Sequence, residues 1–68
     1  MKTTYDKQAD ALYIYFTSGK SVTKTEEVKE DIMVDYDDDG SLIGLEILDA
    51  SKKLSKQTLT SILRDSSK

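Results

Sequence analysis

The sequence predicts one small soluble α+β domain over residues 1–68, an antiparallel β-meander of about four or five strands with a C-terminal helix packed on one face. Two observations support this prediction. Within residues 2–48, apolar runs rich in β-branched and aromatic residues alternate with short turns that contain Asp or Gly. Within residues 50–65, the apolar residues change to the spacing of an amphipathic helix. A chain this short builds one core, so we expect a single domain.

The first three predicted strands differ in how much of their surface they can bury. Residues 2–5 form a short β-prone start. The run at residues 11–16 has no polar alternation, which is typical of a central strand covered on both faces. Residues 22–28 are polar and rich in Thr, so we expect a solvated strand at an edge of the sheet.

Two apolar runs, at residues 32–36 and 42–48, flank the turn sequence Asp-Asp-Asp-Gly, which predicts a β-hairpin. A loop made of these four turn residues places Val34 opposite Ile43 and fixes the alternation of faces. One face of the hairpin then collects Ile32, Val34, Tyr36, Ile43, Leu45 and Ile47.

Helix-capping residues follow the last predicted strand. Asp49 is placed to cap a first helical turn, and Ser55 to cap a helix of about residues 56–64. Leu59, Ile62 and Leu63 form a narrow apolar stripe at the spacing i, i+3, i+4. We therefore expect this helix to lie on the sheet through that stripe.

The composition excludes several classes of function. The chain has no Cys and no His, which removes disulfides and most zinc chemistry and leaves its Ser and Thr residues without a His to activate them. The sequence also contains no Gly-rich phosphate loop. We therefore predict a protein that is not an enzyme and that has no cofactor.

The charges and the N-terminal residues limit the expected partners and location. The net charge is −3, made up of −7 over residues 1–49 and +4 over residues 50–68. An acidic body repels phosphates, so we expect no nucleic-acid partner. The first ten residues hold no apolar signal-peptide core, and no run approaches the roughly 20 apolar residues that span a bilayer. We therefore expect a cytoplasmic protein without a membrane partner.

Three sets of motifs run through most of the chain: residues 5–6 with 9–14, residues 35–36 with 39–40, and residues 44–51. Together they resemble the YuzE-like family of short uncharacterised bacterial proteins. The resemblance implies a bacterial source, a curled β-meander and a C-terminal helix. It implies no activity, cofactor or catalytic residue.

The Asp-rich turn also matches a calcium-loop motif, because residues 35–46 satisfy the EF-hand pattern D-x-D-x-D-G-x5-E. The preceding residues lack the apolar spacing of an entering helix, and the hairpin places Asp35 and Glu46 about 13 Å apart, too far for one ion. We therefore predict a hairpin turn instead of an EF-hand. A weak cation site is left as an alternative at Asp37, Asp38 and Asp39.

Other carboxylates of the chain have structural explanations. Asp6 and Asp10 bracket a turn, where an Asp side chain usually caps the local backbone. Asp35 and Glu46 share a face of the predicted hairpin, and we interpret them as an ordinary surface pair. None of these residues is therefore predicted to be catalytic.

Counting faces predicts self-association. The second face of the sheet still carries apolar and aromatic side chains, at Tyr13, Tyr15, Met33, Leu42 and Leu48. A helix of about nine residues is about 14 Å long and covers only one face. An apolar patch left exposed usually marks an interface, which a two-fold dimer most often buries. These five residues are therefore the predicted interface of a homodimer.

The function that the sequence favours is a non-enzymatic protein-interaction module that self-associates. The alternative is a small ligand or divalent-cation binder that uses the Asp-rich turn. A further alternative, suggested by the small size and acidity, is an antitoxin-like or regulatory partner of a neighbouring gene product. The sequence identifies no such protein partner.

Overall fold

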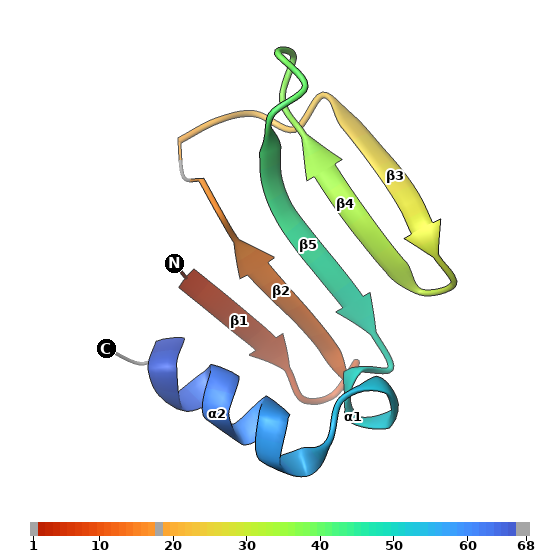
Figure 1. The fold of residues 1–68 in the computed structure, drawn as a ribbon, viewed down its shortest axis with the longest axis vertical. Helices are drawn as coiled ribbons and strands as arrows, with labels where there is room; N and C mark the ends of the chain where they lie inside the picture. The colour runs from red at the N-terminus through yellow and green to blue at the C-terminus, as the bar shows by residue number, and fades with distance from the viewer. Residues whose placement is uncertain (1, 18, 67–68) are drawn as a thin grey trace.

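A five-stranded antiparallel sheet makes up most of the protein, and two helices follow it in the chain (Figure 1). The computed structural model describes residues 2–17 and 19–66. The strands are β1 (Lys2–Asp6), β2 (Ala11–Tyr15), β3 (Lys24–Lys29), β4 (Ile32–Tyr36) and β5 (Leu42–Leu48). The helices are α1 (Ala50–Lys53) and α2 (Lys56–Ser66). The predicted α+β fold class, with an antiparallel sheet and a C-terminal helix, is confirmed.

The order of the strands refines the predicted meander. In space the strands follow the order β1-β2-β5-β4-β3, so β5 lies between β2 and β4. After β2 the chain crosses one end of the sheet to begin β3 at the far edge (Figure 1). β5 has seven residues, most of them apolar, and the central position gives it a paired strand on each side. The sheet is therefore two hairpin units joined through β2 and β5.

The β4–β5 hairpin has a different register from the predicted one. Val34 pairs with Leu45, two residues beyond its predicted partner Ile43. An even shift leaves the side chains on their predicted faces, because side chains alternate with a period of two. Ile32 and Val34 therefore point to the predicted side of the sheet, although their predicted pairing partners on β5 were wrong.

A β-bulge changes the position of one predicted core residue. The register shifts between Asp35 and Tyr36, and Ile43 falls between the β5 residues to which they pair. Ile43 is buried, but it lines a hollow with Tyr13 and Tyr15 and is not part of the core cluster. Its predicted place beside Ile32 and Val34 is therefore corrected, since the bulge breaks the alternation at this point.

The core lies on the side of the sheet that faces the helices, which we call the inner face. Its centre is formed by Leu12 and Ala50, both fully buried, and by Ile47, which is 8% exposed. Half-buried side chains pack around them: Tyr5, Ile14, Leu45, Leu54, Leu59, Ile62 and Leu63. This cluster contains the whole stripe predicted for the C-terminal helix, so α2 packs on the sheet as expected.

The two helices begin in different ways. The Ser55 hydroxyl accepts a hydrogen bond from the Thr58 backbone N–H at 3.0 Å, which confirms Ser55 as the cap of α2. Asp49 holds the N-cap position of α1 with φ 53°, but its side chain makes no capping hydrogen bond. The predicted capping role of the Asp49 side chain is therefore wrong, and Asp10 supplies that contact from the β1–β2 turn.

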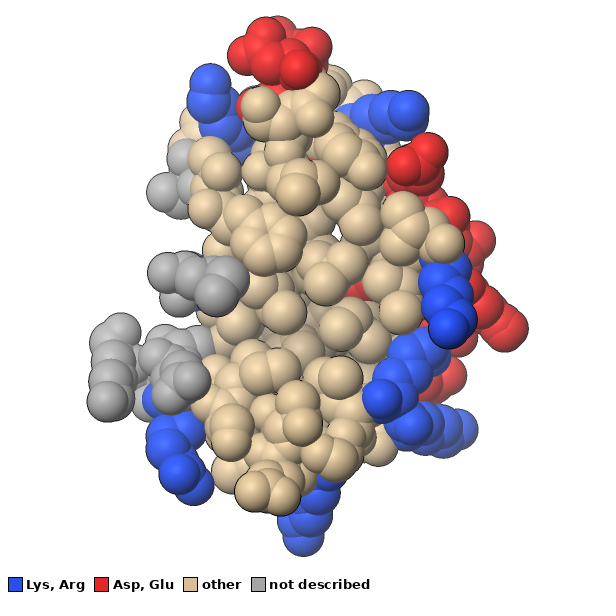
Figure 2. All heavy atoms as spheres, viewed as in Figure 1, with Lys and Arg blue, Asp and Glu red and all other residues tan. Residues whose placement is uncertain are grey.

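The free edge of the sheet at β3 is charged. All six β3 residues, Lys-Thr-Glu-Glu-Val-Lys, are exposed, as predicted for a solvated edge strand. Figure 2 shows charged side chains along this edge and at the β4–β5 turn, with neutral side chains across the middle of the face in view. Charged side chains on an edge discourage pairing with another strand.

In the part of the chain that the structure describes, neither helix is long and apolar enough to cross a membrane.

Candidate functional site

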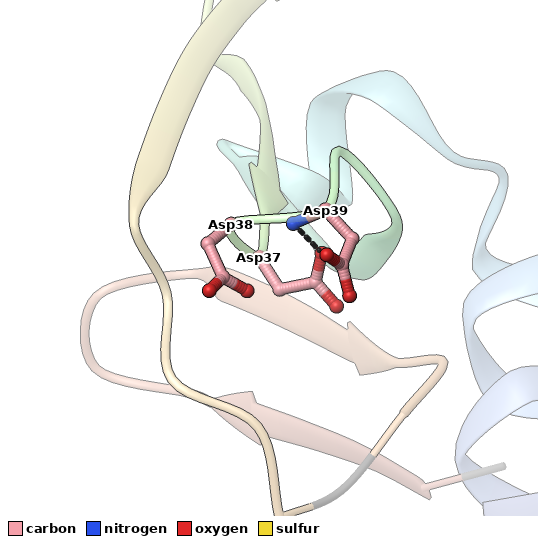
Figure 3. A group of neighbouring side chains, drawn as sticks. All are labelled: Asp37, Asp38 and Asp39. Carbon is pink, nitrogen blue, oxygen red and sulfur yellow. Dashed lines mark hydrogen bonds between the residues drawn. The ribbon is translucent and has the colours of Figure 1, made fainter.

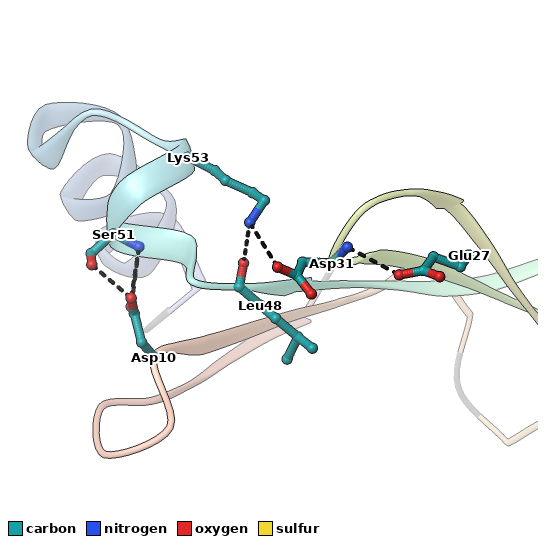
Figure 4. Close-up of polar contacts among 6 residues, drawn as sticks. All are labelled: Asp10, Glu27, Asp31, Leu48, Ser51 and Lys53. Atoms are coloured by element: carbon teal, nitrogen blue, oxygen red, sulfur yellow. Dashed lines mark hydrogen bonds and ion pairs between the residues drawn. The ribbon is translucent and has the colours of Figure 1, made fainter.

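The side of the sheet opposite the helices, which we call the open face, carries a mixture of aromatic, apolar and acidic side chains. The strand register places Tyr13, Tyr15, Met33, Asp35, Glu46 and Leu48 on it. All six are half-buried. Figure 4 shows the Leu48 side chain pointing away from α1, on the opposite side of the sheet.

Four of the five predicted interface residues share the open face: Tyr13, Tyr15, Met33 and Leu48. The fifth, Leu42, pairs with Tyr36 beyond the bulge and is 48% exposed. The run at residues 11–16 was predicted to be covered on both faces. β2 is an interior strand between β1 and β5, and its inner-face residues Leu12 and Ile14 belong to the core cluster. Tyr13 and Tyr15 stay half-buried on the open face, so this prediction holds for the inner face only.

Tyr13 is anchored at the centre of the open face by hydrogen bonds that link three strands. Its hydroxyl donates to Asp35 Oδ2 on β4. The Thr25 hydroxyl on β3 donates to Asp35 Oδ1 at 2.5 Å. Asp35 therefore has a partner for each carboxylate oxygen, and it holds the tyrosine ring in a fixed position.

A glycine makes this anchor possible, because β5 lies between Tyr13 on β2 and Asp35 on β4. Gly44 of β5 pairs with Asp35, and a Cβ at Gly44 would lie 2.5 Å from Cε1 of the Tyr13 ring. The ring crosses β5 through the space that a side chain would fill. This role of Gly44 was not predicted, although a glycine inside an apolar strand is a signal of close approach.

The Tyr13 hydroxyl is a poor acid in this environment. Burial, followed by the hydrogen bond to Asp35, raises the pKa of Tyr13 above its ordinary value of 10.0. A tyrosine with a raised pKa stays protonated at neutral pH and continues to donate its hydrogen bond. Tyr13 therefore keeps its proton near neutrality, and its hydrogen bond to Asp35 acts as a fixed structural contact.

A hollow of about 590 Å³ opens where β1, β2 and β5 meet the segment after β2. Its lining comprises Lys2, Tyr13, Tyr15, Phe16, Thr17, Gly19, Lys20, Val22 and Ile43. The rings of Tyr13 and Tyr15 are 4.4 Å apart between centroids and tilted by 50°. The Lys2 ammonium lies 5.7 Å from the centroid of the Tyr15 ring. The hollow is therefore a polar-rimmed recess with aromatic walls.

The hollow was not predicted from the sequence. Simple alternation along the run at residues 11–16 puts Phe16 on the side of Leu12 and Ile14, whereas Phe16 lines the hollow with the two tyrosines. Lys2 and Lys20 had no assigned role. The pairing of Lys2 with Tyr15 follows from the β1–β2 hairpin, so that contact could have been found from the turn.

The predicted cation candidates occupy the β4–β5 turn. Asp37, Asp38 and Asp39 each offer a carboxylate oxygen, and these oxygens lie within 4.8 Å of one another. The three carboxylates project to the same side of the turn (Figure 3). Asp37 is buried, and its Oδ1 accepts hydrogen bonds from the backbone N–H groups of Asp39 and Ser41, both at 2.9 Å. Asp37 therefore closes the turn, while Asp38 and Asp39 remain exposed.

The EF-hand interpretation is excluded by the elements around the turn. The chain enters through β4 and leaves through β5, so neither flanking helix exists. Glu46 pairs with Met33, which puts it only two residues along the sheet from Asp35 and corrects the predicted separation of about 13 Å. Both carboxylate oxygens of Asp35 nevertheless accept hydrogen bonds from Tyr13 and Thr25, away from the turn.

Two aspartates of the β1–β2 turn have separate structural roles. Asp6 Oδ1 accepts hydrogen bonds from the backbone N–H groups of Gln8 and Ala9 at 3.0 and 3.1 Å, so its predicted local cap is confirmed. Asp10 instead contacts a distant segment, because its carboxylate accepts the Ser51 hydroxyl at 2.7 Å (Figure 4). It also accepts the Tyr5 hydroxyl at 2.6 Å. These two hydrogen bonds, the Ser51 one first, lower the pKa of Asp10.

A second polar contact joins α1 to the β3–β4 turn. The Lys53 ammonium donates to the Leu48 carbonyl at 2.9 Å and lies 3.6 Å from Asp31 Oδ2 (Figure 4). The Asp31 backbone N–H in turn donates to Glu27 Oε2 at 3.2 Å. The contacts of Asp10 and Lys53 therefore fix α1 against both halves of the sheet.

Comparison with known proteins gives a family without an assigned activity. The profile of a family described as "Protein of unknown function (DUF2283)" matches residues 2–51. An uncharacterized protein of Methanocaldococcus jannaschii is 42% identical over 52 residues, which cover 76% of this chain and 43% of that protein. This chain thus spans less than half the length of that relative. No solved structure matches the chain significantly.

Proposed function

The chain belongs to the DUF2283 family of proteins of unknown function, and from this premise we propose that it is a non-enzymatic interaction module that forms a homodimer through the open face. The main support for the proposal is that the helices cover only one face of the sheet. The helices pack on the inner face, whereas the open face keeps half-exposed aromatic and apolar side chains within the described residues. A surface of this kind favours contact with another protein.

The thickness of the domain supports a second copy as the partner. The principal extents are 34, 29 and 18 Å, so the described chain is a slab formed by one sheet and one helical layer. A small domain has little core of its own and gains stability by covering its remaining face. A two-fold dimer buries the same patch on both copies, and no other component is required.

The polar groups of the open face are compatible with burial in such a dimer. Asp35 already has Tyr13 and Thr25 as hydrogen-bond partners, so covering it leaves no carboxylate oxygen unpaired. Lys2 and Glu46 lie on the same face, because Lys2 pairs with Tyr15 and Glu46 with Tyr13. An isologous dimer can set these opposite charges against each other across its axis.

Light scattering after size exclusion tests the dimer at micromolar concentration. We expect wild-type protein at twice the chain mass of 7.6 kDa, and Met33→Lys and Leu48→Asp at the monomer mass. Val28→Lys is the matched control, since Val28 is 53% exposed on the edge strand β3. A folded wild-type monomer, or dimers in all four proteins, contradicts the proposal. Amide NMR spectra verify that each variant is folded.

We also propose a more specific identity for the chain, as a YuzE-like protein from a bacterium. The motifs at residues 5–14, 35–40 and 44–51 favour the YuzE-like proteins and a bacterial source, while the relative from Methanocaldococcus jannaschii is archaeal. The lack of Cys favours a reducing compartment such as the cytoplasm. Small size and acidity favour a regulatory role beside a neighbouring gene product, and the identity of that gene tests this role.

A second candidate function is weak binding of a divalent cation at the β4–β5 turn, which the clustering of Asp37, Asp38 and Asp39 favours. Calcium titration followed by amide NMR tests it. Saturable shifts confined to the turn, absent in an Asp38→Asn, Asp39→Asn double variant, support the site. Shifts that remain in the double variant, or an affinity weaker than about 1 mM, contradict a sensor role.

A further inference from the structure

The hollow beside Tyr15 has the dimensions of a small-molecule site. Its volume of about 590 Å³ lies within the roughly 300–1,000 Å³ of typical ligand pockets. Two exposed hydrophobic residues line it, Phe16 at 46% and Val22 at 48% exposure. Leu42 is equally exposed nearby, where its carbonyl accepts the Thr17 hydroxyl at 3.4 Å. Apolar surface is therefore concentrated around this recess.

The aromatic walls of the hollow are held in place before any ligand arrives. Tyr13 is fixed by its hydrogen bond to Asp35 and by the missing side chain of Gly44. Tyr15 packs against Tyr13 at 4.4 Å between ring centroids. Rings that are already ordered lose little entropy when another ring stacks on them. The hollow is therefore suited to a flat aromatic group.

The charge of the lining differs from the charge of the chain. The chain has 13 acidic and 10 basic residues, yet the lining contains Lys2 and Lys20 and no Asp or Glu. The Lys2 ammonium lies over the Tyr15 ring, 5.7 Å from its centroid, and Lys20 lines the same recess. A recess with two ammonium groups and aromatic walls complements a negatively charged aromatic molecule.

We propose that this hollow binds a small planar aromatic anion, with its ring against Tyr15 and Phe16 and its anionic group between Lys2 and Lys20. Either a carboxylate or a phosphate on such a ligand supplies negative charge to the two ammonium groups. This inference goes beyond the proposed dimer. All the lining residues belong to one chain, but Tyr13 and Tyr15 also lie on the open face, so a dimer through that face would compete with the ligand.

An amide NMR titration with 1-naphthoate tests the site. We expect saturable shifts at residues that line the hollow, with a Kd of about 1 mM or tighter. A Lys2→Gln, Lys20→Gln double variant should bind about fivefold more weakly, since each exposed ion pair contributes a modest amount. A Lys7→Gln, Lys29→Gln double variant removes the same charge outside the lining and should bind within twofold of wild type. Tyr15→Leu should also weaken binding about fivefold through lost stacking.

Two further probes separate the contributions of charge and ring. Naphthalene-1-methanol has the ring without the charge, and cyclohexanecarboxylate has the charge without the aromatic ring; we expect both to bind at least fivefold more weakly than 1-naphthoate. No saturable shift up to about 10 mM, equal binding of the neutral probe, or equal affinity of both lysine double variants overturns the proposal.

Repeating the titration in Leu48→Asp separates the hollow from the dimer, because this variant is expected to be monomeric and Leu48 does not line the hollow. Saturable shifts at the hollow with a Kd no more than twofold weaker than that of wild type support the site. Loss of 1-naphthoate binding in the folded variant overturns the assignment.

Discussion

The inner and open faces of the sheet alternate residue by residue along the same strands, yet they are covered and held in different ways. Leu12 and Ile47 on the inner face are buried under the helices. Their neighbours Tyr13 and Glu46 point to the open face and stay half-exposed. Apolar packing orders the first face, whereas hydrogen bonds through Asp35 order the second. We infer that the inner face stabilises the fold and that the open face is kept ordered for contact with another molecule.

The largest effect should come from the centre of the inner face. Leu12→Ala removes a fully buried side chain and should lower the free energy of unfolding by about 3 kcal/mol. Leu42→Ala, at a side chain that is 48% exposed, is the matched control and should cost less than about 1 kcal/mol. Urea unfolding measures both. Equal losses would mean that the helices do not create the main core.

On the open face, Gly44→Ala should have the next largest effect. The new Cβ would lie 2.5 Å from the Tyr13 ring, and the forced movement should cost about 2 kcal/mol. In a Tyr13→Ala background the same change should be neutral or stabilising by about 0.5 kcal/mol, because Ala orders a strand better than Gly. A double-mutant cycle measures this coupling, and additive effects would show that the glycine has no role in admitting the ring.

Tyr13→Phe sharpens the comparison by removing only the hydroxyl. The variant loses the hydrogen bond to Asp35 and should be about 1 kcal/mol less stable in urea unfolding. Tyr15→Phe is the matched control, since among the described residues the Tyr15 hydroxyl makes no hydrogen bond, and it should change stability by less than about 0.5 kcal/mol. A larger loss of stability in Tyr15→Phe than in Tyr13→Phe would contradict the assignment of the polar anchor to Tyr13.

The smallest effect concerns pH and the Asp10 contact between the β1–β2 turn and α1. Hydrogen bonds from Ser51 and Tyr5 hold the pKa of Asp10 below its ordinary value of 3.8 in the folded protein. The stability that Asp10 contributes is therefore present above about pH 4 and is lost as the pH falls through its lowered folded value. Asp10→Asn should flatten the decline of the urea midpoint below pH 4, whereas Ser61→Ala on α2 should not. Parallel pH profiles in all three proteins would contradict this role.

Local pattern was enough to predict the fold class and most of the inner face. The apolar period identified β5 and the α2 stripe, and the alternation of Val34 and Asp35 survived a register error because the shift was even. The cap at Ser55 was predictable because capping acts over three residues. Features that depend on neighbours in sequence were therefore found.

Features that depend on distant segments were not found. The insertion of β5 beside β2 brings Tyr13 to Asp35 across 22 positions of the chain, and Asp10 reaches Ser51 across 41. The hollow further requires the bulge that turns Ile43 toward the tyrosines. None of these contacts leaves a periodic signal in a single sequence, although Gly44 inside an apolar strand pointed to a close approach.

The most direct test of the account asks which side chains meet another copy of the chain. A soluble paramagnetic probe added to the wild-type protein reports by NMR how exposed the methyl groups of Met33, Leu48 and Val28 are to solvent. We predict that Met33 and Leu48 are protected at high protein concentration and become exposed on dilution, while Val28 on the edge strand stays exposed throughout. Met33 and Leu48 methyl groups that are as exposed as those of Val28 at every concentration would contradict the open face as the dimer interface.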